Sequence, residues 1–475
     1  MPQSLFGSSE RSNFIVNMKP ETFRRWALFI LLGFLILCPL LSLPSELVGI
    51  TSLPPAALTL TGTAALAMLP AGLFKGARGL WNTALLTGAF VLWGIVSALC
   101  SFHAGDPADY TQAFVGTAGR GEGALSLVFC GCFLLLGAML GTSEHRTLLH
   151  GMLLYGLVQC AWGILQALPV GFPSYYRDLE SMLAYRVFLP SGLTGSPITL
   201  AVLLSVLELP AMLAAAYAKD RHRILYLICA GVFPVLVVRT QCLAGIVGAA
   251  VSVMIGIVYL AWKKTGKAVI LTAVPGVVLG CVWWFFAPVL NGTYHDLDPS
   301  SAVMFQLYDG AVLWQDSSYR LDVSGYYFPT ADASPHGTFA IGELRSVYGW
   351  LWGQTAEIIG RYPLTGTGPD CLIYPQLFRS LIPAENPNTF DRAGSYYLHT
   401  AATLGLPGLA LLLLVMVQVF IRGGKTAVRG GWIQTAYLGA ALVSCVTWIV
   451  GNGGVTVTPL FWMIAGVCCA QSKES

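Results

Sequence analysis

Long apolar runs separated by short polar segments dominate the chain. About twelve of these runs reach or approach the ~20 residues that a membrane-spanning helix needs. They lie at 26–44, 55–74, 80–101, 124–142, 149–168, 196–217, 224–238, 242–262, 268–288, 396–421, 432–450 and 455–471. The pattern therefore predicts an all-α polytopic membrane protein with about twelve transmembrane helices.

The lysines indicate how the predicted helices are oriented. In the arrangement with twelve spans, every lysine of the chain falls on the same side of the membrane as the N-terminus. These residues are Lys19, Lys75, Lys219, Lys263, Lys264, Lys267, Lys425 and Lys473. The positive-inside rule makes that side the cytoplasm. We therefore expect a multi-pass protein of the cytoplasmic (inner) membrane of bacterial type, with both termini in the cytoplasm.

The opposite side holds one large loop, residues 289–395, which contains no lysine. A loop of this length inside a compact protein is usually functional. Its mixture of turn residues and apolar anchors predicts a small folded subdomain with short helices, and the segment 303–328 is expected to add a strand or two. The predicted organisation is a cytoplasmic segment 1–25, spans one to nine over 26–288, the extracytoplasmic loop 289–395, and spans ten to twelve with a short tail over 396–475.

Composition narrows the class of protein. The chain is 55% hydrophobic and 10% charged, with a mean hydropathy of +0.68, whereas soluble domains carry about 25% charged residues. It has no basic patch for nucleic acid, and no Cys/His spacing typical of a metal site or a disulfide framework. No metal or cofactor is therefore expected. The single large loop has no counterpart in the first half, which argues against a transporter built from repeats, although a transporter or flippase of lipid-linked glycan stays an alternative.

Two motifs precede and open the tenth predicted span. The first is "RYPLTGTGPDCLIYPQ", with Trp352 ahead of it, and the second is "FDRAGSYYLHTAATLGLPGLALLL". Three further segments stand elsewhere in the chain: "AGRGEGALSLV" at 118–128, "GLTGSPITLAVLLSVLELP" at 192–210 and "TPLFWMIAGV" at 458–467. In this order the five segments resemble the O-antigen ligase and polysaccharide polymerase superfamily. The matching positions are Trp352, Pro363, Gly366, Gly368, Pro369, Asp370, Arg392, Ala393, Tyr397, Leu398, Gly405 and Gly408.

The resemblance implies a metal-independent glycosyltransferase of the GT-C type that works on the outer face of the membrane. Its donor would be a glycan on a polyprenyl diphosphate, and its acceptor a sugar hydroxyl on a lipid core or on a second lipid-linked glycan. A ligase and a polymerase use the same donor, so the sequence leaves both open, together with a protein O-oligosaccharyltransferase.

Arginine is the residue expected to hold the leaving diphosphate. Its guanidinium group binds phosphate oxygens in a bidentate manner and keeps its charge in a site of low dielectric constant. The resemblance implies that arginines on the outer face take this role, and the candidates are Arg345, Arg186, Arg120 and Arg392. Trp352 and Tyr397 are further candidates for contact with the substrate, and membrane lipids surround the site.

The sequence departs from the family where a base is expected. Relatives carry His-Asn at the entry to the tenth span, but this chain has Gly394 and Ser395. Asp391, three residues before Gly394, is our first candidate for the catalytic base because a desolvated carboxylate can take a proton. His399 is the second, since it follows Gly394 by five residues and would lie about 140° round the helix, on a different face.

Glu208 is an isolated acid in the middle of a predicted span. A charge in the hydrocarbon costs on the order of 3 kcal/mol by insertion scales. We therefore expect this side chain to face the interior of the helix bundle and either to be paired or to be protonated.

Overall fold

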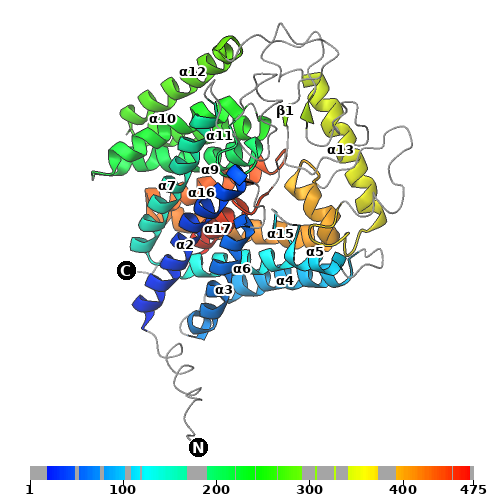
Figure 1. Cartoon of the computed structure of the whole chain (residues 1–475). Coiled ribbons are helices and arrows are strands. Elements are labelled where there is room, and N and C mark those ends of the chain that lie inside the picture. Colours follow the sequence, from blue (N-terminus) through cyan, green and yellow to red (C-terminus); the bar gives the residue numbers. More distant parts are fainter. Residues whose placement is uncertain are drawn as a thin grey trace, which may run out of the picture.

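The computed structural model describes most of the predicted spans and parts of the loops. The described residues are 19–48, 53–74, 80–101, 108–117, 120–167, 190–219, 221–240, 242–264, 266–290, 305–306, 326–327, 341–372, 392–451 and 453–470. Within them the chain is helical apart from two strands of two residues each and the connecting turns (Figure 1).

Each of the predicted apolar runs forms a helix. These helices are α2 (Pro20–Val48), α3 (Leu53–Phe74), α4 (Trp81–Leu99), α6 (Ala124–Met139), α7 (Thr142–Ala167), α9 (Pro197–Tyr217), α10 (Arg223–Thr240), α11 (Leu243–Trp262), α12 (Lys267–Leu290), α15 (Tyr396–Gly430), α16 (Trp432–Thr447) and α17 (Thr458–Cys469). Among the described residues, eight helices are long and apolar enough to cross a membrane: α2, α3, α4, α7, α9, α10, α11 and α15. Shorter apolar helices lie in α6, α12, α16 and α17. The prediction of a helical multi-pass membrane protein is therefore confirmed.

The described part of the large loop includes a helix that is longer than the sequence suggested. Helix α13 (Ile341–Arg361) has 21 residues, where short helices were expected. Strands β1 (Phe305–Gln306) and β2 (Tyr326–Tyr327) pair antiparallel within the segment where strands were predicted. A further short helix, α5 (Ala108–Val115), precedes α6 and was not predicted.

Helix α9 forms the centre of the bundle. It packs against α7, α10, α11, α12 and α16, and every residue from Pro197 to Ala215 is buried. A helix that is apolar on all sides is expected to be enclosed in this way. Glu208 lies in it with 0% exposure, and neither carboxyl oxygen has a hydrogen-bond partner among the described residues. The prediction that it faces the interior is confirmed, and the missing partner favours the protonated form, because an unpaired buried carboxylate is far more costly.

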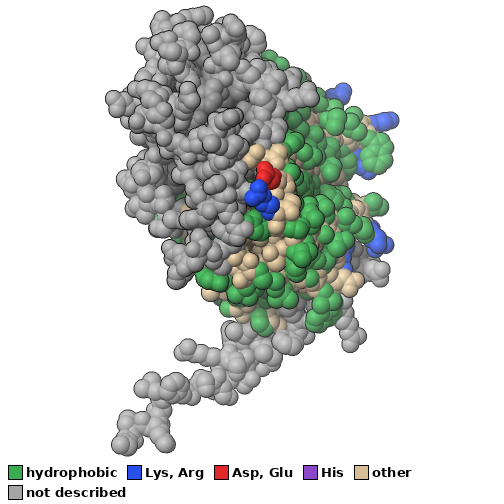
Figure 2. Space-filling model, turned by 90° about the vertical axis from the view of Figure 1, so that its right-hand side faces the viewer, with side chains coloured by type: hydrophobic (Ala, Val, Ile, Leu, Met, Phe, Trp, Pro, Cys, Tyr) green, Lys and Arg blue, Asp and Glu red, His purple; other side chains and the backbone are tan. Residues whose placement is uncertain are grey.

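Three helix ends that the sequence analysis places on the same side of the membrane lie together. The last turns of α9 and α11 meet through Tyr217 and Tyr259, whose ring centroids are 6.4 Å apart. Trp432, at the start of α16, stacks on Tyr217 at 6.1 Å. In Figure 2 the described part of this face is largely hydrophobic, with Lys and Arg side chains along one edge and one basic and one acidic side chain beside the grey region. Such a surface is what lipid contact requires of a helix bundle.

Helix α15 is broken near its beginning by a kink. Gly405 has φ 73° and ψ 175°, and Pro407 follows it. Proline lacks an N–H group and clashes with the carbonyl of the preceding turn, so the helical hydrogen bonds are interrupted there. The released carbonyl groups of Ala402 and Thr403 accept hydrogen bonds of 2.9 Å each from the amides of Thr367 and Gly368.

The kink therefore binds the Pro-Leu-Thr-Gly-Thr-Gly-Pro-Asp turn, residues 363–370. The amide of Leu406 in turn donates to the carbonyl of Pro363 at 2.8 Å. A Cβ atom added to Gly405 would lie 1.9 Å from the carbonyl oxygen of Leu364. The glycine is thus required both by the left-handed backbone and by the close approach of the turn.

We expect the substitution Gly405→Ala to destabilise the protein strongly. The positive φ alone costs about 1–3 kcal/mol for a residue with a side chain, and the contact with Leu364 adds to this. Gly424→Ala is the matched control, since Gly424 lies in the same helix with nothing within 4 Å of the added Cβ. In thermal unfolding in detergent, the melting temperature should be much lower than that of the wild type for Gly405→Ala and unchanged for Gly424→Ala. Equal stability of the two variants would contradict the described turn.

Candidate functional site

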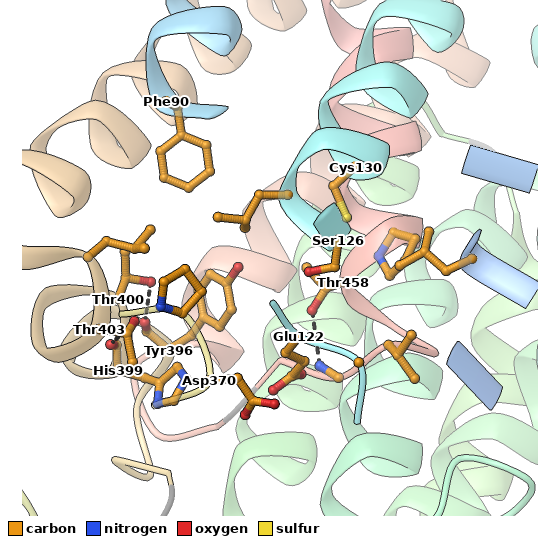
Figure 3. Close-up of a pocket in the computed structure, with 18 residues that line it drawn as sticks. Phe90, Glu122, Ser126, Cys130, Asp370, Tyr396, His399, Thr400, Thr403 and Thr458 are labelled. Atoms are coloured by element: carbon orange, nitrogen blue, oxygen red, sulfur yellow. Dashed lines mark hydrogen bonds between the residues drawn. The ribbon is translucent and has the colours of Figure 1, made fainter. Parts of the chain in front are cut away.

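A pocket lies where α4, α6, α15 and α17 meet the turn 363–370 (Figure 3). It encloses about 590 Å³ of space that protein atoms do not fill, including the solvent at its mouth. Phe90 lies toward one end, whereas Glu122, Asp370 and His399 gather at the other. The other lining residues are Leu58, Gly121, Ser126, Leu127, Cys130, Pro369, Tyr396, Thr400, Thr403, Leu404, Gly454, Val455, Thr458 and Pro459. The pocket therefore has one apolar end and one polar end.

Asp370 ends the turn and forms the first ion pair of the polar end. Its carboxylate lies 2.7 Å from Nη2 of Arg120, and its side chain is 1% exposed. The amide of Thr117 donates to the second carboxylate oxygen at 2.5 Å, and the side-chain amide of Gln112 donates to the Asp370 carbonyl at 2.7 Å. These contacts fasten the segment between α5 and α6 to the turn, and hence to the kink of α15.

Arg392 and Glu122 form a second ion pair in the same place. Nη2 of Arg392 lies 2.9 Å from the Glu122 carboxylate, with side chains 3% and 19% exposed. Arg392 also donates to the carbonyl of Gly453, in the segment between α16 and α17. Arginine is suited to this position because its several N–H groups can satisfy a carboxylate and a carbonyl at once. Three segments far apart in the sequence are joined by this one side chain.

His399 lines the same pocket as Asp370 and Glu122. Its ring interacts electrostatically with Asp370, Arg120 and Arg392. Figure 3 shows the ring beside Asp370 at the polar end. The Nδ1 atom is buried and has no hydrogen-bond partner among the described residues. A neutral imidazole has one ring nitrogen that donates and one that can accept a proton.

The position of His399 follows from where α15 begins. The first helical residue is Tyr396 and Ser395 is the extended N-cap residue, while Gly394 has a positive φ of 64°. Gly394 is therefore outside the helix, and an angle counted from it at 100° per residue does not describe the direction of His399. The histidine points into the pocket from the second turn of the helix.

The start of α15 is held by α16. The amide of Tyr396 donates to the carbonyls of Trp448 and Gly451 at 3.0 and 2.9 Å, and the rings of Tyr396 and Trp448 are 4.2 Å apart. The hydroxyl of Tyr397 donates to the carbonyl of Cys445 at 2.9 Å. Tyr396 therefore lines the pocket, whereas Tyr397 contacts α16. These contacts fix the helix end that carries His399.

The predicted site residues are found in different places. The structure brings Arg120, Arg392 and His399 together at the polar end of the pocket. Asp391 and Arg186 lie outside the described residues, and the side chain of Arg345 is not described although its helix α13 is. Trp352, also on α13, packs against the hydrophobic core and is not among the residues that line the pocket.

The sequence analysis did not identify Glu122 or the role of Asp370. Glu122 stands two residues after Arg120 in "GRGEG". An acidic residue between two glycines, so close to a candidate arginine, was the feature of the sequence that could have identified it. Asp370 was recognised only as part of a turn. Among the described residues, no group of three or more His, Cys, Asp or Glu side chains is placed to hold a metal ion.

Comparison with known proteins agrees with the two motifs. Residues 224–413 match the model of the family described as O-antigen ligase. The matched segment runs from α10 to the part of α15 beyond the kink, and it contains Asp370, Arg392 and His399. No curated protein matches the chain. The resemblance seen in the sequence is thus confirmed over residues 224–413, the part of this chain that matches the O-antigen ligase family.

Proposed function

We propose that this protein transfers a glycan from a polyprenyl diphosphate to a sugar hydroxyl on the outer face of the cytoplasmic membrane, as an O-antigen ligase or a surface polysaccharide polymerase. The observation that carries the proposal is the place of His399. Its ring lies in a pocket formed by the turn and the kinked helix of the segment that matches the O-antigen ligase family. Its Nδ1 is buried and has no hydrogen-bond partner among the described residues.

His399 would act as the general base. The acceptor hydroxyl donates a hydrogen bond to the ring, and its oxygen forms a bond to the anomeric carbon of the donor. The bond from that carbon to the diphosphate breaks, the diphosphate leaves with the electron pair, and the proton passes to the imidazole. The carboxylate of Asp370, which interacts with the ring, would favour the imidazolium ion that forms. The apolar end of the pocket near Phe90 suits the lipid part of the donor.

The arginines would have two different tasks. Arg120 and Arg392 are each paired with a carboxylate, so much of their charge is already compensated. We assign them to positioning the pocket. Arg345 and Arg186, whose side chains lie outside the described residues, stay the candidates for direct contact with the diphosphate, because a guanidinium group forms charge-assisted hydrogen bonds with phosphate oxygens.

The reaction can be tested by deleting the gene in its host and examining the surface glycans. Loss of long chains with single repeats retained would show a polymerase, and accumulation of lipid-linked polymer would show a ligase. Loss of glycan from proteins alone would show a protein O-oligosaccharyltransferase. Unchanged glycan chain length with lipid-linked glycan held at the inner face would contradict the proposal and favour a flippase.

We infer that all twelve apolar helices cross the membrane and that both termini are cytoplasmic. Introduced cysteines test this after the exposed Cys100 and Cys281 have been replaced by serine. A reagent that cannot cross the membrane should label the variant Arg361→Cys from outside and leave Lys264→Cys unlabelled in intact cells. Labelling in the reverse pattern would contradict the orientation, and with it the proposed reaction on the outer face.

A further inference from the structure

A second hollow lies at the opposite end of the bundle, where α7 and α16 begin and α9 ends. Its lining residues are Arg146, Tyr217, Lys219, Trp432 and Ile433, and it contains about 700 Å³ of space together with the solvent at its mouth. Trp432 and Trp448 mark the two ends of α16, so about 24 Å of helix separates this hollow from the pocket of His399. The two sites are therefore independent.

The chemistry of this hollow is that of an anion site beside aromatic rings. Arg146 and Lys219 are exposed cations, and the described residues that line the hollow include no acid. Tyr217 and Trp432 stack with their rings 10° from parallel. An arginine and a lysine together bind phosphate oxygens by a bidentate contact and a point charge.

The aromatic rings continue as a row across the neighbouring helix. Tyr217 contacts Tyr259, Tyr259 contacts Trp262 at 6.5 Å, and the ammonium group of Lys263 lies 4.6 Å over the Trp262 ring. Tyrosine and tryptophan gather at the depth of the lipid headgroups, where one side of the ring is wet and the other is apolar. The row places the hollow at that depth.

Helices α11 and α7 both carry exposed apolar side chains along the part of each helix that leads to the end near the hollow. Met254, Val258 and Trp262 of α11 are 57%, 64% and 74% exposed, and they follow one another at intervals of four residues along the helix. On α7, Leu154 and Val158 are 40% and 46% exposed, beyond Arg146 along the chain. Apolar side chains exposed on membrane-spanning helices contact acyl chains. The hollow therefore lies where the acyl-chain surface gives way to the charged end of the bundle.

We propose that Arg146, Lys219, Tyr217 and Trp432 form a binding site for the phosphate headgroup of an anionic phospholipid. The two cations bind the phosphate group, and the stacked rings contact the glycerol and the first methylene groups. A lipid is favoured over free phosphate as the source because Tyr217, which lines the hollow, is linked through Tyr259 to Trp262 on the exposed apolar surface of α11. The site does not depend on the glycan transfer proposed above.

The test uses the purified full-length protein and native mass spectrometry. The protein is mixed with vesicles of phosphatidylcholine and phosphatidylglycerol, and the lipids that stay bound are counted. We expect the wild type to retain phosphatidylglycerol in preference to phosphatidylcholine. Arg146→Gln and Lys219→Gln should each weaken phosphatidylglycerol binding about tenfold, the usual effect of losing one charged hydrogen bond. Arg146→Lys should keep part of the affinity, since lysine keeps the positive charge but lacks the guanidinium group that binds phosphate in a bidentate manner.

Lys425→Gln is the matched control, because Lys425 is an exposed lysine of α15 that does not line the hollow. Its lipid binding should equal that of the wild type. Equal retention of the two lipids by the wild type would overturn the proposal without any variant. Displacement of phosphatidylglycerol by inorganic phosphate at an equal concentration would also overturn it, since the site would then take free phosphate. If Lys425→Gln lost as much phosphatidylglycerol binding as Lys219→Gln, the proposal would also be overturned, because the lipid would then be attracted by the overall positive charge and not by this site.

Discussion

Replacing His399 with glutamine is expected to reduce glycan transfer by about 10²- to 10⁴-fold, the contribution of a positioned general base. Glutamine keeps the polarity and much of the size of the side chain but cannot take the proton. The acceptor hydroxyl can still form a hydrogen bond to it, so kcat should fall while KM changes little. The measurement is the rate of product formation by purified protein in proteoliposomes supplied with lipid-linked glycan and acceptor.

His150→Gln is the matched control for this variant. His150 lies on α7 with Nδ1 2.9 Å from the Tyr226 hydroxyl, and it does not line the pocket. Its activity should equal that of the wild type. Gly394→His in the His399→Gln background should restore part of the activity, because it returns an imidazole to the family position and histidine tolerates a positive φ better than most residues.

Asp391→Asn distinguishes the two candidates for the base. If it abolishes transfer while His399→Gln leaves the rate unchanged, the assignment to His399 is wrong and the carboxylate is the base. If both variants lose activity but only His399→Gln keeps a normal KM, Asp391 serves acceptor binding and the histidine remains the base.

Arg120→Met is expected to lower the free energy of unfolding by about 3–5 kcal/mol, the usual cost of removing one partner of a buried ion pair. The side chain of Asp370 is 1% exposed, and its carboxylate would keep the hydrogen bond from the Thr117 amide. It would lose Arg120, its only ion-pair partner among the described contacts. The double variant Arg120→Met, Asp370→Asn should recover part of the loss, because the uncompensated charge is then gone. The free energy of unfolding of the wild type, the single variant and the double variant is measured in detergent by circular dichroism.

Arg361→Met is the control, because it removes a salt bridge that is exposed to solvent rather than buried. Arg361 and Glu357 form an i, i+4 pair on α13 at 2.6 Å, with side chains 47% and 46% exposed. Such exposed pairs contribute about 0.3–0.5 kcal/mol. If Arg120→Met costs no more than Arg361→Met, or if the double variant shows no coupling, the pair does not hold the pocket together.

The helices of this protein were predictable because length and hydrophobicity alone specify them. The separate helices α10 and α11 could be predicted even though only Arg239, Thr240 and Gln241 stand between the predicted apolar runs. Ends were less accurate: α15 continues to Gly430, beyond the apolar run that ends near 421, because a helix can extend past the membrane with charged residues such as Lys425 and Arg429.

The pocket could be predicted only in part. The two motifs indicated that the turn 363–370 and the start of α15 belong to one site, but not that Thr367 and Gly368 would be bound to the kink. Glu122 is separated from Arg392 by about 270 residues, and a single sequence contains no signal for such a pairing. The orientation of His399 depended on the first residue of the helix, which hydrophobic periodicity does not locate to within one residue.

The kink in α15 has a consequence for the thickness of the membrane. The part beyond it, residues 408–430, is about 35 Å long at 1.5 Å per residue, and its apolar stretch to residue 421 accounts for about 21 Å of a hydrocarbon core of ~30 Å. The turns that carry His399 are bound instead to the turn 363–370 and to the end of α16. In a thicker or thinner bilayer the lower part of α15 can change its tilt. The imidazole would then keep its depth relative to the outer headgroups, so we expect a reaction rate that depends little on the acyl-chain length of the surrounding lipid.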